Sequence, residues 1–177
     1  MIAKKLLAAS AVLTVLAVVA PAQANDPASC KAVRFSDVGW TDITATTAAT
    51  SVVLSGLGYE PKTQILSVPV TYASLKNGDI DVFLGNWMPT MEGDLAPYRD
   101  EGSVEVLKEP NLRGAKYTLA VPKAIADAGL KDFADIAKFK DKLDGKIYGI
   151  EPGNDDNRLI LEMTAQGVCG VTGLDVL

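Results

Sequence analysis

The chain of 177 residues carries 17 basic and 22 acidic side chains, which gives a net charge of -5 at neutral pH. Such an acidic chain does not suit a nucleic acid or an anionic membrane surface as a partner. It contains no histidine. This excludes the Ser-His-Asp triad and most metal centres, so we expect no cofactor and no metal.

The first 24 residues have the pattern of a secretory signal peptide. Lys4 and Lys5 precede an apolar run over residues 6–20, and the segment 21–24 reads PAQA. An Ala-x-Ala site after such a run is typical of signal peptidase cleavage, whereas a membrane span requires about 20 apolar residues. We therefore expect cleavage after Ala24 and export to the periplasm.

Two cysteines, Cys30 and Cys169, lie too far apart in the sequence for a CxxC redox motif or a four-ligand zinc site. Export would permit a structural disulfide. The residues before Cys30 read Pro-Ala-Ser and lack the aliphatic residue of a lipobox, so lipidation is not expected.

From residue 32 onward, short apolar runs alternate with stretches of helical periodicity, which is typical of an α/β fold with a parallel sheet. We expect strands at 32–36, 63–68 and 80–84. We expect a first helix that Thr41 or Asp42 caps and that ends at Gly56 or Gly58, a second at 71–77 that Gly78 closes, and a third at 90–100. This βαβαβ order places ligand loops at the carboxyl ends of the strands. The apolar stripe expected to bury the first helix consists of Ala45, Ala48, Ala49, Val52 and Val53.

The pattern changes at residues 104–121, where two extended stretches with no helix between them indicate a crossing into a second lobe. A helix from Lys123, an amphipathic segment at 132–143, a strand at 146–150 and a final helix after residue 154 follow. The segment 174–177 reads as the beginning of another strand. We expect a first lobe over residues 25–110 and an incomplete second lobe over residues 111–177.

Large aromatic side chains fall on the expected loops. Trp40, with Asp42 close by, follows the first strand, Trp87 follows the third, and Tyr117 lies at the crossing between lobes. Aromatic faces beside a carboxylate suit a permanent cation, which has no hydrogen to donate. Each cation-π contact contributes about 0.5 to 2 kcal/mol, and micromolar binding requires about 8 kcal/mol, so several rings must act together.

Each of these residues also has a purely structural interpretation. A tryptophan or tyrosine is commonly part of a core or its rim. Asp42 has the side chain of a helix N-cap. Asn154 suits a turn before the last helix, with Asp155 as the cap of that helix. Their joint placement on neighbouring loops is what favours a binding site.

The chain resembles the choline and glycine-betaine substrate-binding proteins of ABC importers. The segments that carry the resemblance are 38–42 (VGWTD), 85–90 (GNWMPT), 117–122 (YTLAVP) and 150–155 (IEPGND). The resemblance covers most of the chain after the signal peptide and fades after Glu162. Members of this family are considerably longer, and Cys30 resembles a family cysteine whose partner lies beyond residue 177.

The resemblance implies a two-lobed periplasmic binding protein of type II that closes on its ligand by a hinge. Such a protein is a monomer that delivers its ligand to an ABC permease in the inner membrane. By this likeness Trp40, Trp87 and Tyr117 form an aromatic box around a trimethylammonium group. Asp42, Asn154 and Asp155 then lie near the polar end or the charge of the ligand.

Choline is the favoured ligand, because unpaired acids such as Asp42 and Asp155 would repel the carboxylate of glycine betaine or proline betaine. Amides at a helix N-terminus could still receive a carboxylate, so a betaine remains an alternative. An exported enzyme that acts on a choline ester or phosphocholine, with Asp42, Asp155 or Asp156 as base, is a further alternative. The last alternative is a fragment that folds poorly and binds nothing, since an incomplete sheet exposes edges and apolar faces.

Overall fold

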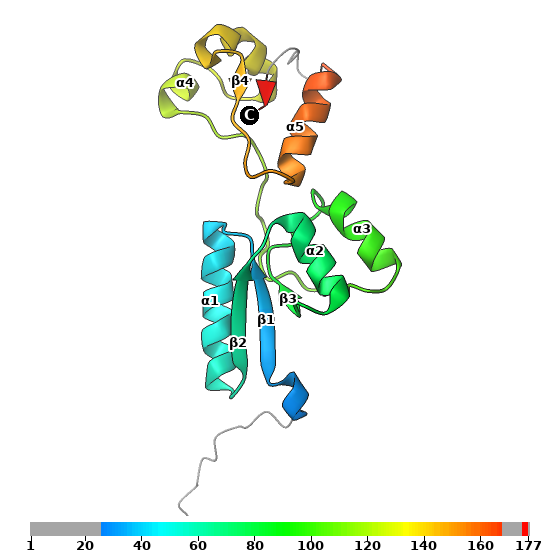
Figure 1. Ribbon diagram of the computed structural model, residues 1–177. Coiled ribbons are helices and arrows are strands. Elements are labelled where there is room, and N and C mark those ends of the chain that lie inside the picture. The colour runs from blue at the N-terminus through cyan, green and yellow to red at the C-terminus, as the bar shows by residue number, and fades with distance from the viewer. Residues whose placement is uncertain (1–25, 168–174, 177) are drawn as a thin grey trace, which may run out of the picture.

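The computed structural model describes residues 26–167 and 175–176, and it has the expected α/β fold in two lobes (Figure 1). The predicted signal peptide and Cys169 lie outside these residues. No helix in the described part of the chain is both long and apolar enough to cross a bilayer. After a 3-10 turn η1 (Ala28–Cys30), the first lobe comprises β1 (Ala32–Asp37), α1 (Thr41–Gly56), β2 (Glu60–Ile65), α2 (Val68–Asn77), β3 (Val82–Phe83) and α3 (Glu92–Asp100).

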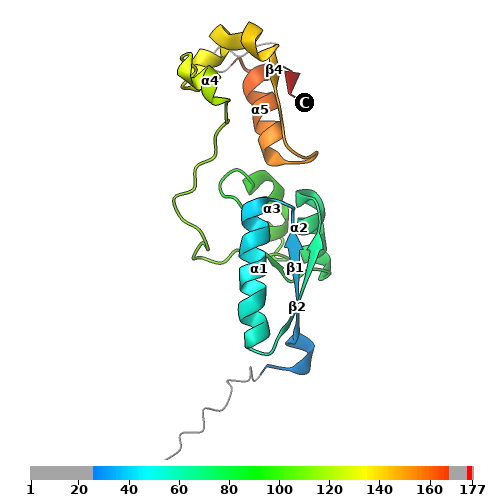
Figure 2. The same ribbon diagram turned by 90° about the vertical axis from the view of Figure 1, so that its left-hand side faces the viewer.

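The second lobe follows a segment, residues 105–122, that contains neither helix nor strand. Figures 1 and 2 show this segment running from one lobe to the other. The elements of the second lobe are α4 (Lys123–Asp127), the 3-10 helix η2 (Phe133–Leu143), β4 (Lys146–Ile147), α5 (Asp155–Ala165) and β5 (Asp175–Val176). The pairing of β4 with β5 is parallel, and β5 lies where the sequence predicts a new strand.

The sheet of the first lobe has the order β2-β1-β3, and both neighbours run parallel to β1. The chain moves to one side of β1 and then crosses to the other, and right-handed crossovers put the two connecting helices on opposite faces. Accordingly α1 packs along β1 and β2, while α2 packs against α3 across the sheet (Figure 1). The predicted βαβαβ order is confirmed, and the loops after β1 and β3 point toward the second lobe.

Several element boundaries differ from the prediction. The second strand, expected at 63–68, ends at Ile65, and α2 begins at Val68 instead of residue 71 because Pro69 sits in its first turn, where a proline is tolerated. Gly78, in the left-handed region at φ 72°, ends α2 as expected. The strand expected at 146–150 is limited to Lys146–Ile147.

The expectations for α1 were wrong in two respects. Its N-cap is Trp40, which makes no side-chain capping bond, and neither Thr41 nor Asp42 takes that position. Its buried residues are Ile43 and Thr47, so the predicted stripe faces solvent, with Val52 73% and Val53 63% exposed. Apolar residues occur on more than one face of this helix, and periodicity alone therefore could not select the face that meets the sheet.

The core of the first lobe lies directly beneath the loops that carry the tryptophans. Its buried members are Val68, Tyr72, Met91 and Leu95, and Trp40 and Trp87 pack against this cluster. The Tyr72 ring stacks on Tyr98 with centroids 5.9 Å apart and an interplanar angle of 17°. The loops that carry Trp40 and Trp87 are thus supported by packed aromatic rings.

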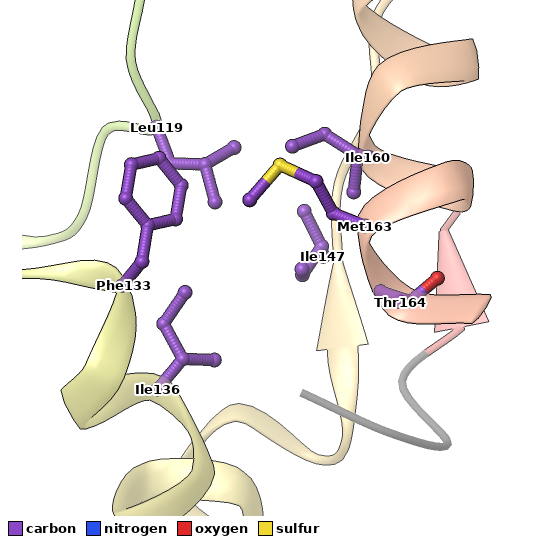
Figure 3. Close-up of a pocket in the computed structure, with 7 residues that line it drawn as sticks. All are labelled: Leu119, Phe133, Ile136, Ile147, Ile160, Met163 and Thr164. Carbon is purple, nitrogen blue, oxygen red and sulfur yellow. The ribbon is translucent and has the colours of Figure 1, made fainter. Parts of the chain in front are cut away.

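The second lobe has a separate core, whose buried members are Leu130, Ile136 and Phe139. Beside it a pocket opens between η2, β4 and α5 (Figure 3), lined by Leu119, Phe133, Ile136, Ile147, Ile160, Met163 and Thr164. Every lining side chain except Thr164 is apolar, and none is charged. This pocket contains no carboxylate to pair with a cation, whereas aromatic rings and acids occur together where the lobes meet.

Candidate functional site

Two rings from distant parts of the chain lie against each other. Trp87 follows β3, and Tyr117 comes from the connecting segment; their ring centroids are 5.9 Å apart at an angle of 37°. The Trp87 loop is fixed because its backbone N–H donates to Met91 Sδ at 3.3 Å and its carbonyl accepts from Thr90 Oγ1 at 2.9 Å. Trp87 and Tyr117, both predicted from the sequence, therefore lie together at one corner of the candidate site.

Trp40 reaches the second lobe through the edge of its indole. The turn that presents it is closed by the Asp37 carboxylate, which accepts the Gly39 N–H at 2.7 Å. Trp40 Nε1 donates to Glu151 Oε1 at 3.0 Å, and the same oxygen accepts from Asn154 Nδ2 at 2.7 Å. One carboxylate thus links a predicted residue of each lobe.

Asn154 and Asp155 are almost completely buried, at 2% and 1% exposure. Asn154 is the N-cap of α5, since its Oδ1 accepts the N–H of Asp156 at 2.8 Å; the expectation that Asp155 caps this helix was wrong. Both carboxylate oxygens of Asp155 are buried without a hydrogen-bond partner among the described residues. A buried carboxylate in this state lowers the stability of the folded protein unless a hydrogen-bond donor or a cation pairs with it.

Three acidic side chains act on Tyr117 through their charge. Burial, together with the charges of Asp156, Asp155 and Glu151, raises the pKa of the Tyr117 hydroxyl above its ordinary value. Burial and the neighbouring Asp155 also raise the pKa of the Asp156 carboxyl. Like charges that disfavour each other's ionisation are relieved by a bound cation, so the electrostatics of this site favour a positive ligand.

A basic side chain close to these acids is already paired. Arg158, one turn along α5 from Asp155, donates to Asp94 of α3 through two nitrogens at 3.3 and 3.2 Å. This pair crosses from one lobe to the other, and the bond to Asp94 raises the pKa of Arg158. Arg158 therefore serves the contact between lobes and makes no hydrogen bond to Asp155, whose charge contributes to the raised pKa of Arg158 only in addition to that of Asp94.

The structure does not bring Asp42 into this network. Asp42 is exposed in the first turn of α1, where its backbone carbonyl accepts from Thr46 Oγ1 at 2.8 Å. Glu151, by contrast, joins this network through its bonds to Trp40 and Asn154, and it was not predicted as a site residue. Its place three residues before Asn154, in a turn that opens a helix, was the available signal.

The sequence of the chain matches a known protein family. A profile of the family described as the substrate binding domain of ABC-type glycine betaine transport system matches residues 31–166. The chain belongs to this family. An uncharacterized protein, ORF1, of Chromohalobacter salexigens is 55% identical over 130 residues, which cover 73% of this chain and 83% of that protein.

Two solved structures of an ABC-transporter choline binding protein are also similar to this member of the glycine betaine substrate-binding family. One, in complex with choline, is 64% identical with a TM-score of 0.79 and aligns with 86% of this chain and 52% of its own. The other, unliganded and semi-closed, is 65% identical with a TM-score of 0.73 and aligns with 84% and 51%. The chain thus spans about half the length of these solved proteins, which share its two-lobed fold.

Proposed function

We propose that the chain belongs to a protein that binds choline outside the cytoplasmic membrane and delivers it to the permease of an ABC importer. The observation that carries this proposal is Asp155, a buried carboxylate without a hydrogen-bond partner among the described residues, whose charge acts on Tyr117, the residue whose ring packs against Trp87. Export by the leader at residues 1–24, a periplasmic location and a monomeric state belong to the same proposal, as does the lobe boundary after residue 110.

The proposed cage uses the rings of Trp40, Trp87 and Tyr117 as walls for the trimethylammonium group. Aromatic faces attract such a cation through their quadrupoles, and its methyl groups gain from leaving water. Asp155 supplies the opposite charge, and Asn154 fixes the loop at the polar end of the ligand. Asp42 is exposed, so we propose a role for it only at the outer rim of the site.

Choline is proposed ahead of glycine betaine because the acids around Tyr117 would repel a second carboxylate. Arg158, which could otherwise receive that carboxylate, is held by Asp94. The close structural relative that contains choline supports the same order. The family description names glycine betaine, so the two ligands are compared directly in the test.

A role without catalysis is part of the proposal. The alternative of an enzyme acting on a choline ester would use one of the acids as a base. The family is one of substrate-binding domains, and the burial of Asp155 suits a residue that holds a charged ligand. An assay with a choline ester, in which released choline is measured, tests this alternative directly.

Isothermal titration of the chain with choline, glycine betaine and alanine tests the binding proposal. We expect saturable binding of choline, weaker binding of glycine betaine and none of alanine. Trp87→Ala should weaken choline binding about 10- to 30-fold through loss of a cation-π contact and apolar burial, while Trp87→Phe keeps a ring and loses less. A folded chain that binds no quaternary ammonium compound would contradict the proposal.

A further inference from the structure

Glu151 occupies the point where the two lobes meet at the candidate site. It lies in the turn between β4 and α5, and Figure 1 shows this end of α5 facing the first lobe. Its Oε1 atom accepts from Trp40 Nε1 at 3.0 Å and from Asn154 Nδ2 at 2.7 Å. Trp40 and Glu151 are 111 residues apart in the sequence, so this contact exists only while the lobes are together.

The turn that carries Glu151 is held from behind by a side chain of α5. Asn157 Oδ1 accepts the Ile150 N–H at 2.9 Å, and Asn157 Nδ2 donates to the carbonyls of Ile150 at 3.0 Å and Glu151 at 3.2 Å. These bonds fix the backbone on both sides of the peptide that precedes Glu151. The carboxylate is therefore presented to Trp40 by a rigid support.

The hydrogen bond to Glu151 sets the orientation of the Trp40 ring. The indole N–H is the only polar group of tryptophan and can only donate. A bond at this edge fixes the rotation of the ring and leaves its faces free for a cation. A charged acceptor makes the bond stronger than a neutral one would.

We propose that Glu151 is a positioning residue of the cage, which orients Trp40 and couples the assembly of the aromatic walls to the approach of the lobes. This inference rests on the proposed function, because it assumes that Trp40 is a wall of the cage. Glu151 itself acts through Trp40 and Asn154 and need not touch the ligand.

The test uses Trp87→Phe as background, because the chain has 2 tryptophans and Trp40 is then the sole one. In this background Glu151→Ala should shift the emission of the ligand-free chain to longer wavelength as the indole becomes mobile and hydrated. Glu151→Gln retains an acceptor oxygen and should leave the emission close to the parent. Glu162→Ala, which removes an exposed acid of α5, is the matched control and should change nothing.

Choline titration of the same variants completes the test. Glu151→Ala should weaken choline binding about tenfold, and Glu151→Gln should recover most of this loss. Unchanged emission and affinity in Glu151→Ala would overturn the proposal, as would equal losses in both variants without an emission shift, which would mark Glu151 as a charge acting on the ligand. The emission shift needs no ligand, so it would support the positioning role even if the chain failed to bind choline.

Discussion

At the scale of single residues, Asp155 combines a structural cost with a proposed function. Its two carboxylate oxygens are buried and lack hydrogen-bond partners among the described residues, and a buried acid in this condition lowers the stability of the ligand-free protein. Its charge also contributes to the raised pKa values of Tyr117 and Asp156. Such a group is tolerated where a ligand supplies the missing partner.

The substitution Asp155→Asn should therefore separate stability from binding. We expect the free energy of unfolding without ligand to rise by about 1 kcal/mol, because a neutral amide is less costly to bury. Choline affinity should fall at least about tenfold with the lost charge, and glycine betaine affinity should fall less. Urea unfolding and isothermal titration measure the two effects.

Asp141→Asn is the control for this substitution, since Asp141 is an exposed acid of the same lobe. This control should change neither the free energy of unfolding nor the choline affinity. If Asp155→Asn destabilised the chain and left choline affinity intact, Asp155 would be a structural residue, and the cage would need another source of charge.

At the scale of elements, the carboxylate of Asp81 joins β1, the central strand, to the start of β3. Asp81 accepts from the Arg34 backbone N–H at 2.8 Å, from Arg34 Nε at 2.9 Å and from Arg34 Nη2 at 2.6 Å. The side chain of Arg34 is 37% exposed and that of Asp81 is 36% exposed, so water screens the pair and its contribution is modest. These bonds hold the pKa of Asp81 below its ordinary value, and the bond from the Arg34 side chain contributes most.

Asp81→Asn should lower the stability of the chain by about 1 kcal/mol or less at neutral pH. A carboxyl whose pKa is lower in the folded chain than in the unfolded chain stabilises above the unfolded pKa, and this contribution disappears as the pH falls through the folded pKa. The difference between the two proteins should therefore shrink below about pH 4. Urea unfolding at neutral and acidic pH checks this, with Glu105→Gln, an exposed acid in the connecting segment, as control. A difference that persisted at low pH would assign the effect to packing.

Most of the element order was predictable from the sequence. Alternating strand and helix patterns, and the glycines that end helices, depend on residues that are close together in the chain. Gly78 at a left-handed helix end is an example. The buried face of α1 was not predictable, since threonines such as Thr47 face the sheet and valines such as Val52 face solvent. That choice depends on what packs against the helix, which its own periodicity does not contain.

At the scale of the whole molecule, the candidate site forms only because two lobes meet. The sequence predicted Trp87, Tyr117, Asn154 and Asp155 through their loop positions and the family likeness, and their ligand roles stay predictions. It gave no sign of the hydrogen bond between Trp40 and Glu151 or of the ion pair between Arg158 and Asp94, since contacts between distant segments have no local pattern.

The pair of Arg158 with Asp94 makes a prediction about the balance between open and closed forms. Side chains that are 43% and 17% exposed contribute about 0.2 to 1 kcal/mol, which favours the closed form by a factor of about 1.4 to 5. Arg158→Gln should therefore enlarge the radius of gyration in X-ray scattering and weaken choline binding by about that factor, because ligand affinity scales with the population of the competent form. Lys123→Gln, which breaks a pair within α4, should change neither. An Arg158→Gln chain that kept the parent radius and choline affinity but bound glycine betaine more weakly would show instead that Arg158 governs ligand choice.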